Sequence, residues 1–421
     1  MANKFKSLGA AALVFCMMAS AAAAPAYDLR CERLVEPVAI DRKQPRLSWK
    51  LPDGVKGQSA YRILVADSTG QLVRNEGSLW DSGKVPSDQS HLVPYAGRRL
   101  GSAQQVFWKV KAWDESGRDL GWSEPSSWRM GLLERQDWKA EWIQGAVPVV
   151  RGDDIEYWLD MAMLRQTEPV EHFEKYKRDL LRRAGGNLVL AKRFTLDKVP
   201  EQALMHATAQ GYYTVYLNGT RVGQRYYEPA IGYIRSPLYY EVQDVTRLLT
   251  AGENEIRVVL TRGRHKLRTS NHWESYPAEE GEPALLLQIV RPGHLTQPLV
   301  QTDTSWKQMP GAVVKGTFYL GEVYDSRRDP ARAEVPLDDR AWKPVSVVAV
   351  DRKLLSRAFP PERVVREVRP KKVFSPASGV WVFDLGEMIT GTLRWKEPKG
   401  MAAGDRVTFR YVQRLQREGW E

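Results

Sequence analysis

The strongest constraint on the fold is a segment of alternating apolar and polar residues that runs from Gly211 to Gly263. Its first half has the period of a half-buried strand, with Tyr213, Val215 and Leu217 on one face. Asn218-Gly219 then supplies the positive φ that a tight hairpin turn requires, and a second turn at 251–254 precedes another alternating run. Two strand pairs are not stable alone, so the segment needs an opposing sheet and predicts a β-sandwich.

A chain of 421 residues is too long for one small core, and its length favours roughly two to four domains. Between residues 27 and 133, short alternating runs are separated by clusters of Gly, Pro, Ser and Asp at the spacing of an all-β sandwich. WSEPSSW, residues 122–128, closes this region as in a fibronectin type III-like module. We interpret its aromatic residues as core rather than as a platform for a ligand.

The first 26 residues have the composition of a secretory signal peptide. Lys4 and Lys6 precede an apolar run over residues 8–18, and cleavage motifs follow at residues 22–24 (AAA) and 24–26 (APA). No other run reaches the roughly 20 apolar residues of a membrane span. The sequence therefore predicts a secreted or periplasmic protein with no membrane association after cleavage.

The formal net charge of +11 falls by two, to +9, when residues 1–26 are removed. The positive residues are scattered and form no basic helix, so we expect no nucleic acid partner, while a weak attraction to acidic polysaccharide stays open. Cys31 is the only cysteine left after cleavage, which excludes an internal disulfide. We interpret it as a buried thiol that acts as a small hydrophobe.

A central module is expected at residues 134–345, and it contains a strong helical pattern at 153–184, divided by Pro169. Acidic residues near the start of this pattern and basic residues near its end suit the helix macrodipole. The sequence therefore predicts a helical insertion at about 150–186. We interpret its acidic residues as a solvated face rather than as acid/base pairs: Glu156, Asp160, Glu171, Glu174 and Asp179.

The stretch from Arg262 to Pro283 is too long and polar for a simple connection, and loops of this length are usually functional or mobile. It contains His265, His272 and Glu274, but their spacing matches no recognised ligand pattern. We therefore expect no metal site and no cofactor.

A second polar cluster combines Glu322, Tyr324 and Asp325 with two arginines, Arg327 and Arg328. Carboxylate and guanidinium groups so close together form bidentate pairs that fix a domain junction, or they hydrogen-bond the hydroxyls of a sugar. The residues alone leave both roles open.

A third β-rich region is expected at residues 346–421, with alternating patterns at 381–395 and 407–411. A sandwich does not normally end on an unpaired strand, because the exposed edge would be open to aggregation. The region therefore predicts an incomplete sandwich.

Several of these segments, in the same order, resemble the N-terminal half of the bacterial α-L-rhamnosidases. Those similar to the family's fibronectin-like module are PRLSWKL (45–51), LWDSGKV (79–85), WKVKAWDESG (108–117) and WSEPSSW (122–128). Those similar to its jelly-roll module are YYTVYLNGTRVG (212–223), DVTRLLTAGEN (244–254), TDTSWK (302–307) and GEVYDSRRD (321–329). FDLGEMITGTLRW (383–395) resembles the start of its concanavalin-like module, with Met388 where the family commonly has Asn.

The resemblance implies hydrolysis of terminal α-L-rhamnose with inversion, which needs two carboxyl groups about 6.5 to 9.5 Å apart. In the family these groups lie in an (α/α)6 barrel that is C-terminal to all the modules above. No residue of this sequence matches the catalytic pair, so we predict no catalytic residue and no activity of the chain alone.

Three hypotheses follow. The chain is the front part of an α-L-rhamnosidase whose barrel is missing, a stand-alone protein that binds a rhamnose-containing glycan or glycoside, or an adaptor for a separate catalytic chain. The candidate sugar-binding residues are Tyr213, Asn218, Tyr233, Trp273, Glu322, Tyr324 and Asp325.

Overall fold

The computed structural model describes residues 24–146, 185–230, 237–263, 282–317, 321–329, 336–337, 340–396, 398–402, 405, 407–409 and 411. The predicted helical insertion and nearly all of the predicted signal peptide lie outside these residues. The described secondary structure is nearly all strand, which confirms the mainly β fold. The chain divides into two compact units, residues 1–361 and 362–421, and the first unit contains two sandwich modules.

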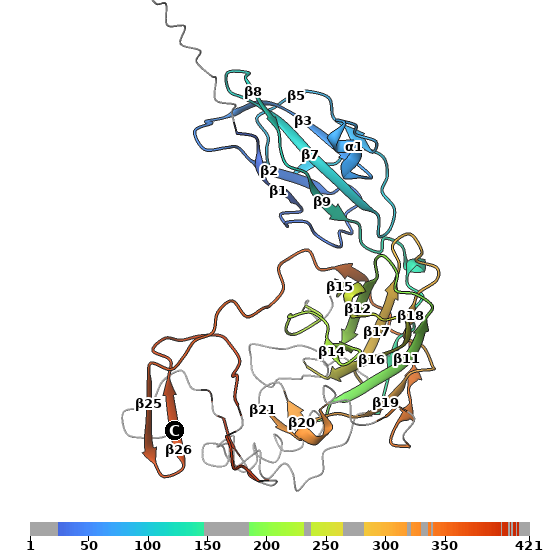
Figure 1. Ribbon diagram of the computed structural model, residues 1–421, viewed down its shortest axis with the longest axis vertical. Helices are drawn as coiled ribbons and strands as arrows, with labels where there is room; N and C mark the ends of the chain where they lie inside the picture. Colours follow the sequence, from blue (N-terminus) through green and yellow to red (C-terminus); the bar gives the residue numbers. More distant parts are fainter. Residues whose placement is uncertain are drawn as a thin grey trace, which may run out of the picture. The chain divides into compact units, whose positions relative to one another are not determined.

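The first module packs two antiparallel sheets around one apolar core (Figure 1). One sheet has the order β1-β2-β6 (Tyr27–Cys31, Arg46–Lys50 and Val93–Pro94). The other has the order β4-β3-β7-β8 (Trp80–Asp81, Gln58–Ala66, Gln105–Asp114 and Asp119–Trp122), with β5 (Val85–Pro86) on β3 and β9 (Ser126–Arg129) on β7. Helix α1 (Thr69–Val73) lies beside β3, and η1 (Arg135–Asp137) follows the module.

Alternation along β7 decides which aromatic residues enter this core. Trp108 points inward, is fully buried, and packs edge-on against Trp128 with 6.4 Å between ring centroids. Cys31 is also in this core as a free thiol, and burial raises the pKa of the thiol, so the prediction of a buried cysteine is confirmed. Trp113, on the other face of β7, is only partly covered. The prediction of core aromatics therefore holds for one face only.

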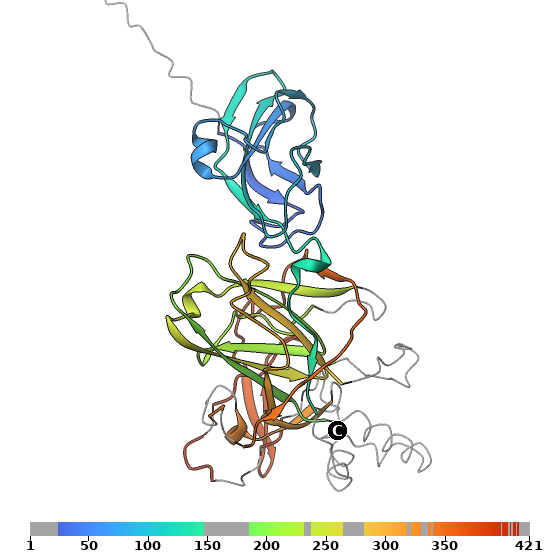
Figure 2. The same ribbon diagram turned by 90° about the vertical axis from the view of Figure 1, so that its right-hand side faces the viewer.

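The second module is a larger sandwich (Figure 2). One sheet has the order β23-β10-β17-β12-β15-β24 (Ser346–Val347, Ile143–Gln144, Ala284–Val290, Leu204–Gln210, Leu238–Asp244 and Leu354–Ser356), with β18 (Val300–Gln301) on β17. The other has the order β14-β13-β16-β11-β19-β22 (Thr220–Arg221, Tyr212–Leu217, Gly252–Thr261, Leu188–Leu196, Lys307–Pro310 and Lys343–Pro344). Apolar residues of both sheets, including Leu190, Val258 and Leu287, form one buried cluster. This is the predicted β-sandwich.

The predicted hairpin is present as β13 and β14. Asn218 and Gly219 form its turn with φ values of +50° and +75°, the left-handed region that a tight hairpin turn uses. After η2 (Thr246–Leu248), the predicted second turn leads into β16, which lies between β13 and β11. The turn sets the register of β13 on β14, in which Tyr216 pairs with Arg221 and Leu217 with Thr220.

The second module continues past residue 345, where the sequence analysis ended it. Strand β23 pairs with β10, and β24 pairs in parallel with β15 through Leu238–Leu354 and Tyr240–Ser356. These short strands cover the two edges of the sheet, which lowers the risk of pairing with another chain. The boundary at 345/346 is therefore too early, because such short edge strands leave almost no periodic signal in the sequence.

Tyr240 joins the two modules of the first unit. Its hydroxyl donates to Asp41 Oδ1 (2.7 Å) and accepts the backbone N–H of Leu132 (2.8 Å). Asp41 Oδ2 accepts the backbone N–H of Ser356, so one carboxylate holds both β15 and β24. Burial raises the pKa of Asp41 in spite of these hydrogen bonds.

The second unit, within its described residues, has one antiparallel hairpin, β25 (Lys372–Ala377) and β26 (Val380–Asp384). Large side chains on it are exposed, with Trp381 63% and Phe383 60% accessible. The expected strand around 407–411 is not formed among its described residues. The incomplete concanavalin-like sandwich expected at 346–421 stays a prediction, because most residues after 402 lie outside the described ranges.

Candidate functional site

Tyr213, the first predicted sugar-binding residue, lies in the core of the second module. It is 3% exposed, and its hydroxyl donates to the backbone carbonyl of Ala207 (3.1 Å). Alternation along β13 turns Tyr213 toward the opposing sheet together with Val215 and Leu217. A ring with no accessible face has no surface on which a sugar can stack, so the expectation for Tyr213 does not fit its position.

Asn218 uses its side chain to hold the hairpin turn. Its Nδ2 donates to the carbonyl of Leu248 and to Asn254 Oδ1, both at 2.9 Å, while its Oδ1 accepts the N–H of Glu255 (2.9 Å). These contacts tie the turn to β16. They use both N–H hydrogens of the Asn218 amide and one hydrogen bond to its carbonyl oxygen. The amide is therefore part of the fold rather than a free group for a ligand.

Glu322 and Tyr324 lie on β21 (Gly321–Tyr324), which pairs with β20 (Val313–Thr317), and Asp325 directly follows β21. Asp325 caps η3 (Ser326–Arg328) and forms a bidentate pair with the guanidinium of Arg327, both bonds at 2.8 Å. Tyr324 is 51% exposed, and its hydroxyl donates to Asp329 Oδ2 (2.6 Å). These three predicted site residues are neighbours in the sequence, and the hydrogen bonds of Tyr324 and Asp325 go to Asp329 and Arg327. Tyr233 and Trp273 lie outside the described residues.

A buried ionic cluster, which sequence reasoning missed, lies beside the core of the second module. Glu228 and Glu241 are 6% and 2% exposed. Arg225 Nη1 is 3.0 Å from Glu241 Oε2 and 3.6 Å from Glu228 Oε1, and Arg357 Nη2 is 2.9 Å from Glu241 Oε2. The Gln243 amide donates to both Glu228 oxygens at 3.1 and 3.2 Å. The sequence pattern was misleading, because Glu241 and Gln243 alternate with Tyr240 and Val242 as on a solvated strand face, whereas all four residues are buried.

The two carboxylates of this cluster have different environments. Burial raises the pKa of Glu228 to about 7, the charge of Glu241 adds to the rise, and the guanidinium groups of Arg225 and Arg357 oppose it. A raised carboxyl pKa beside a second carboxylate is what a general acid requires. Inversion, however, needs room for a water and a sugar between carboxyl groups about 6.5 to 9.5 Å apart. Since Glu228 and Glu241 share one guanidinium nitrogen and are buried, they suit a structural ion cluster and not glycoside hydrolysis.

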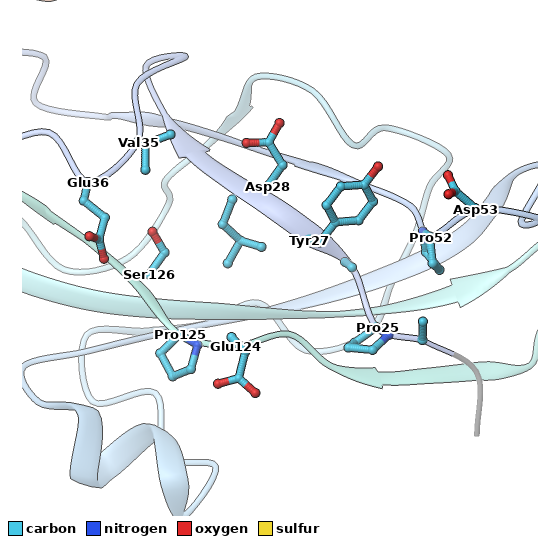
Figure 3. Close-up of a pocket in the computed structure, with 13 residues that line it drawn as sticks. Pro25, Tyr27, Asp28, Val35, Glu36, Pro52, Asp53, Glu124, Pro125 and Ser126 are labelled. Atoms are coloured by element: carbon cyan, nitrogen blue, oxygen red, sulfur yellow. The ribbon is translucent and has the colours of Figure 1, made fainter. Parts of the chain in front are cut away.

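An open depression of about 540 Å³ lies on the first module (Figure 3). Its lining of thirteen residues includes Pro25, Tyr27 and four carboxylates, Asp28, Glu36, Asp53 and Glu124. Asp28 is paired with Arg30 (2.9 Å) and Lys50 (2.8 Å), and these hydrogen bonds lower its pKa. None of the predicted site residues lines this depression.

Within the described ranges, no group of three or more His, Cys, Asp or Glu side chains is placed to hold a metal ion. His265, His272 and Glu274 lie outside those ranges. Among the described helices, none is long and apolar enough to cross a membrane.

Two family models match the chain one after the other. Residues 26–134 match the Rha78A-like N-terminal immunoglobulin domain, and residues 198–366 match the alpha-L-rhamnosidase N-terminal domain. An α-L-rhamnosidase of Formosa agariphila is 29% identical over 375 residues, which cover 85% of this chain and 37% of the relative. The chain matches the N-terminal modules of α-L-rhamnosidases. The sequence resemblance is thereby confirmed.

The solved structures agree with these rhamnosidase modules. The α-L-rhamnosidase from Dictyoglumus thermophilum superposes with a TM-score of 0.70 and 26% identity over 87% of this chain and 39% of that one. The Streptomyces avermitilis enzyme, solved with L-rhamnose, has the same fold with a TM-score of 0.70 at 23% identity and is covered to 48%. The chain therefore spans less than half the length of these relatives. The part of the rhamnosidases that this chain matches does not include the catalytic barrel. In agreement, the described residues contain one α-helix, α1, which has five residues.

Proposed function

We propose that this chain supplies the non-catalytic front modules of an α-L-rhamnosidase that acts on rhamnose-containing glycans or glycosides. The observation that carries the proposal is the succession of two rhamnosidase N-terminal modules across residues 26–366. In this role the two sandwiches form a support for a catalytic barrel that this chain does not match. The buried contacts of Tyr240 and Glu241 suit such a support, because they join β15 to the first module and to β24.

The genomic sequence that follows codon 421 tests this proposal. A segment that resembles the catalytic part of the Formosa agariphila relative, in frame or in the next gene, is the expected result. If the region encodes nothing of this kind, the chain is not the front part of a glycosidase, and a role in binding is the better account.

The second candidate function is carbohydrate binding by the chain itself, and the exposed Tyr324 beside Glu322 is the observation that favours it. A tyrosine ring can lie against the apolar face of a deoxy sugar while a neighbouring carboxylate accepts hydrogen bonds from its hydroxyls. Calorimetric titration with L-rhamnose at millimolar concentration measures this. Heat that disappears in Tyr324→Ala supports binding at the end of β21, and no heat in the wild type removes the hypothesis.

We also propose that the chain is exported, with its signal peptide cleaved after Ala24. The motif at residues 22–24 fits this position as well as the motif at 24–26 does. Ala26, however, is 2% exposed and belongs to the core of the first module, directly before β1. Cleavage after Ala26 would remove a core residue. N-terminal sequencing of the exported protein should give Pro25 first, whereas Tyr27 first would contradict this cleavage site.

A further inference from the structure

The outer face of the β3-β7-β8 sheet in the first module carries a row of tryptophan rings and basic side chains. Residues of odd number in β7 point away from the core, which places Lys109, Lys111 and Trp113 on this face. Strand β8 adds Trp122 opposite Lys111, and β3 adds Arg62 on the other side of Lys111. Helix α1 covers one end of the face, where Leu72 packs with Leu64 and Ala66, and Trp122 is partly buried against this cluster.

Cations and rings alternate along this row. The Lys84 ammonium lies 4.4 Å from the Trp113 ring centroid, and the Lys111 ammonium lies 5.9 Å from it. The Lys111 ammonium also lies 5.3 Å from the Trp122 ring centroid. The Lys109 ammonium lies 4.6 Å from the same centroid, and the Arg62 guanidinium lies 5.9 Å from it. We name these six residues the Trp–Lys face: Arg62, Lys84, Lys109, Lys111, Trp113 and Trp122. Cation–π contacts hold the ammonium groups in place without neutralising their charge.

The Trp–Lys face has an excess of positive charge. Arg62 is paired with Asp81 (2.6 Å), and Lys111 is paired with Asp119 (2.9 Å). Lys84 is exposed and forms no ion pair with a described residue, and Lys109 is bonded to the neutral amide of Asn75 (2.6 Å). Lys109 is only 6% exposed, so Lys84 is the accessible cation of the face that has no ion pair with a described residue, and it raises the local potential toward anions.

We propose that the Trp–Lys face binds an acidic polysaccharide. The exposed Lys84 side chain can swing off the Trp113 ring, so that the apolar face of a sugar packs against the indole while the sugar's carboxylate meets the Lys84 ammonium group. A chain of uronic acids repeats both features along its length, as the Trp–Lys face does along β7. Charge complementarity thus selects a uronate polymer over a neutral glycan. The proposal does not depend on the proposed part in rhamnoside hydrolysis.

The test uses the full chain in affinity electrophoresis through gels that contain polygalacturonate, with pullulan as the neutral polymer. Wild type should be retarded by polygalacturonate and not by pullulan, and the retardation should decrease as salt rises. Trp113→Ala should weaken the apparent affinity about tenfold, and Lys84→Gln about fivefold. Lys84→Gln is the safer variant for folding, because its side chain is exposed and only covers a ring.

Matched controls are Trp381→Ala and Lys372→Gln in the second unit, which remove an exposed tryptophan and a lysine that lies over the Phe374 ring (5.0 Å). They should bind as wild type does. Equal losses in Lys84→Gln and Lys372→Gln would mean that only net charge matters, and this result would overturn the proposal. So would equal retardation by pullulan, no retardation by polygalacturonate, or retardation by duplex DNA that Trp113→Ala does not reduce.

Discussion

Arg357 and Glu241 form an ion pair with 2.9 Å between Nη2 and Oε2, and their side chains are only 3% and 2% exposed. Arg357 directly follows β24, whereas Glu241 lies in the middle of β15. The pair therefore fastens the segment that leaves the second module to a strand in its sheet. Glu241 also pairs with Arg225 (3.0 Å), so it links the β14–β15 connection to the same point.

Arg357→Met should lower the free energy of unfolding of the first unit by about 3 to 5 kcal/mol, because it leaves the carboxylate of Glu241 buried beside one fewer cation. The double variant Arg357→Met with Glu241→Gln should recover part of this loss. Urea unfolding followed by tryptophan fluorescence measures both. The exposed pair Arg74–Glu76 (2.8 Å) supplies the control, since Arg74→Met should leave the urea midpoint unchanged. Equal losses in Arg357→Met and Arg74→Met would contradict the structural role of the buried pair.

Glu228 should make the first unit less stable as the pH rises from about 4.5 to about 7. Its pKa is raised from 4.5 to about 7 in the folded state, so the folded state holds more protons than the unfolded state in this range. The unfolding free energy then falls with rising pH, by on the order of 3 kcal/mol for this group. Below pH 4.5 the contribution is fully present.

Glu228→Gln removes this titrating group and keeps an amide of similar shape. Between pH 5 and pH 7.5, the urea midpoint of the variant should therefore rise relative to that of the wild type. The charged neighbours Glu241, Arg225 and Arg357 are unchanged in both proteins, so they largely cancel in the comparison. A difference that does not change with pH would show that Glu228 is already ionised at pH 5.

Gly131→Ala should disrupt the contacts that join the two modules. A Cβ at Gly131 would collide with Asp41 Oδ1 and with the Tyr240 hydroxyl, the two atoms that are hydrogen-bonded there. We expect a loss of about 1 to 3 kcal/mol and faster proteolysis between the modules. Gly101→Ala is the control, because its Cβ would meet nothing closer than Gln104 Oε1 at 3.8 Å. Resistance to proteolysis equal to that of wild type would contradict the junction described here.

The parts of the fold that could be predicted from the sequence are those set by local patterns. Asn218-Gly219 marked the hairpin turn, because few other residue pairs adopt positive φ at both positions. Cys31 was placed in the core from residue type and compartment alone. Strand β24 could not be predicted, since three residues carry no period and their partner, β15, lies more than one hundred residues earlier.

The candidate site was harder to predict, because alternation does not say which face of a strand meets solvent. Tyr213 shares the inward face of β13 with Val215, so it is a core residue although tyrosine is common at sugar-binding surfaces. For Trp113 the error was in the other direction. It was assigned to the core with the other aromatics of the first module, yet it lies on the outer face of β7 beside Lys111. The burial of Glu228 depends on Arg225 and Gln243, whose approach is set by tertiary structure.

We predict that this chain, which matches rhamnosidase N-terminal modules, has no catalytic carboxyl pair. The most direct test is incubation of the purified chain, residues 25–421, with an aryl α-L-rhamnoside at high enzyme concentration, with release of the phenol as the readout. We predict no release above the rate without protein, for wild type and for Glu228→Gln alike. Turnover that is abolished by one carboxylate substitution, at Glu228, Glu241 or any other acidic residue, would contradict the account.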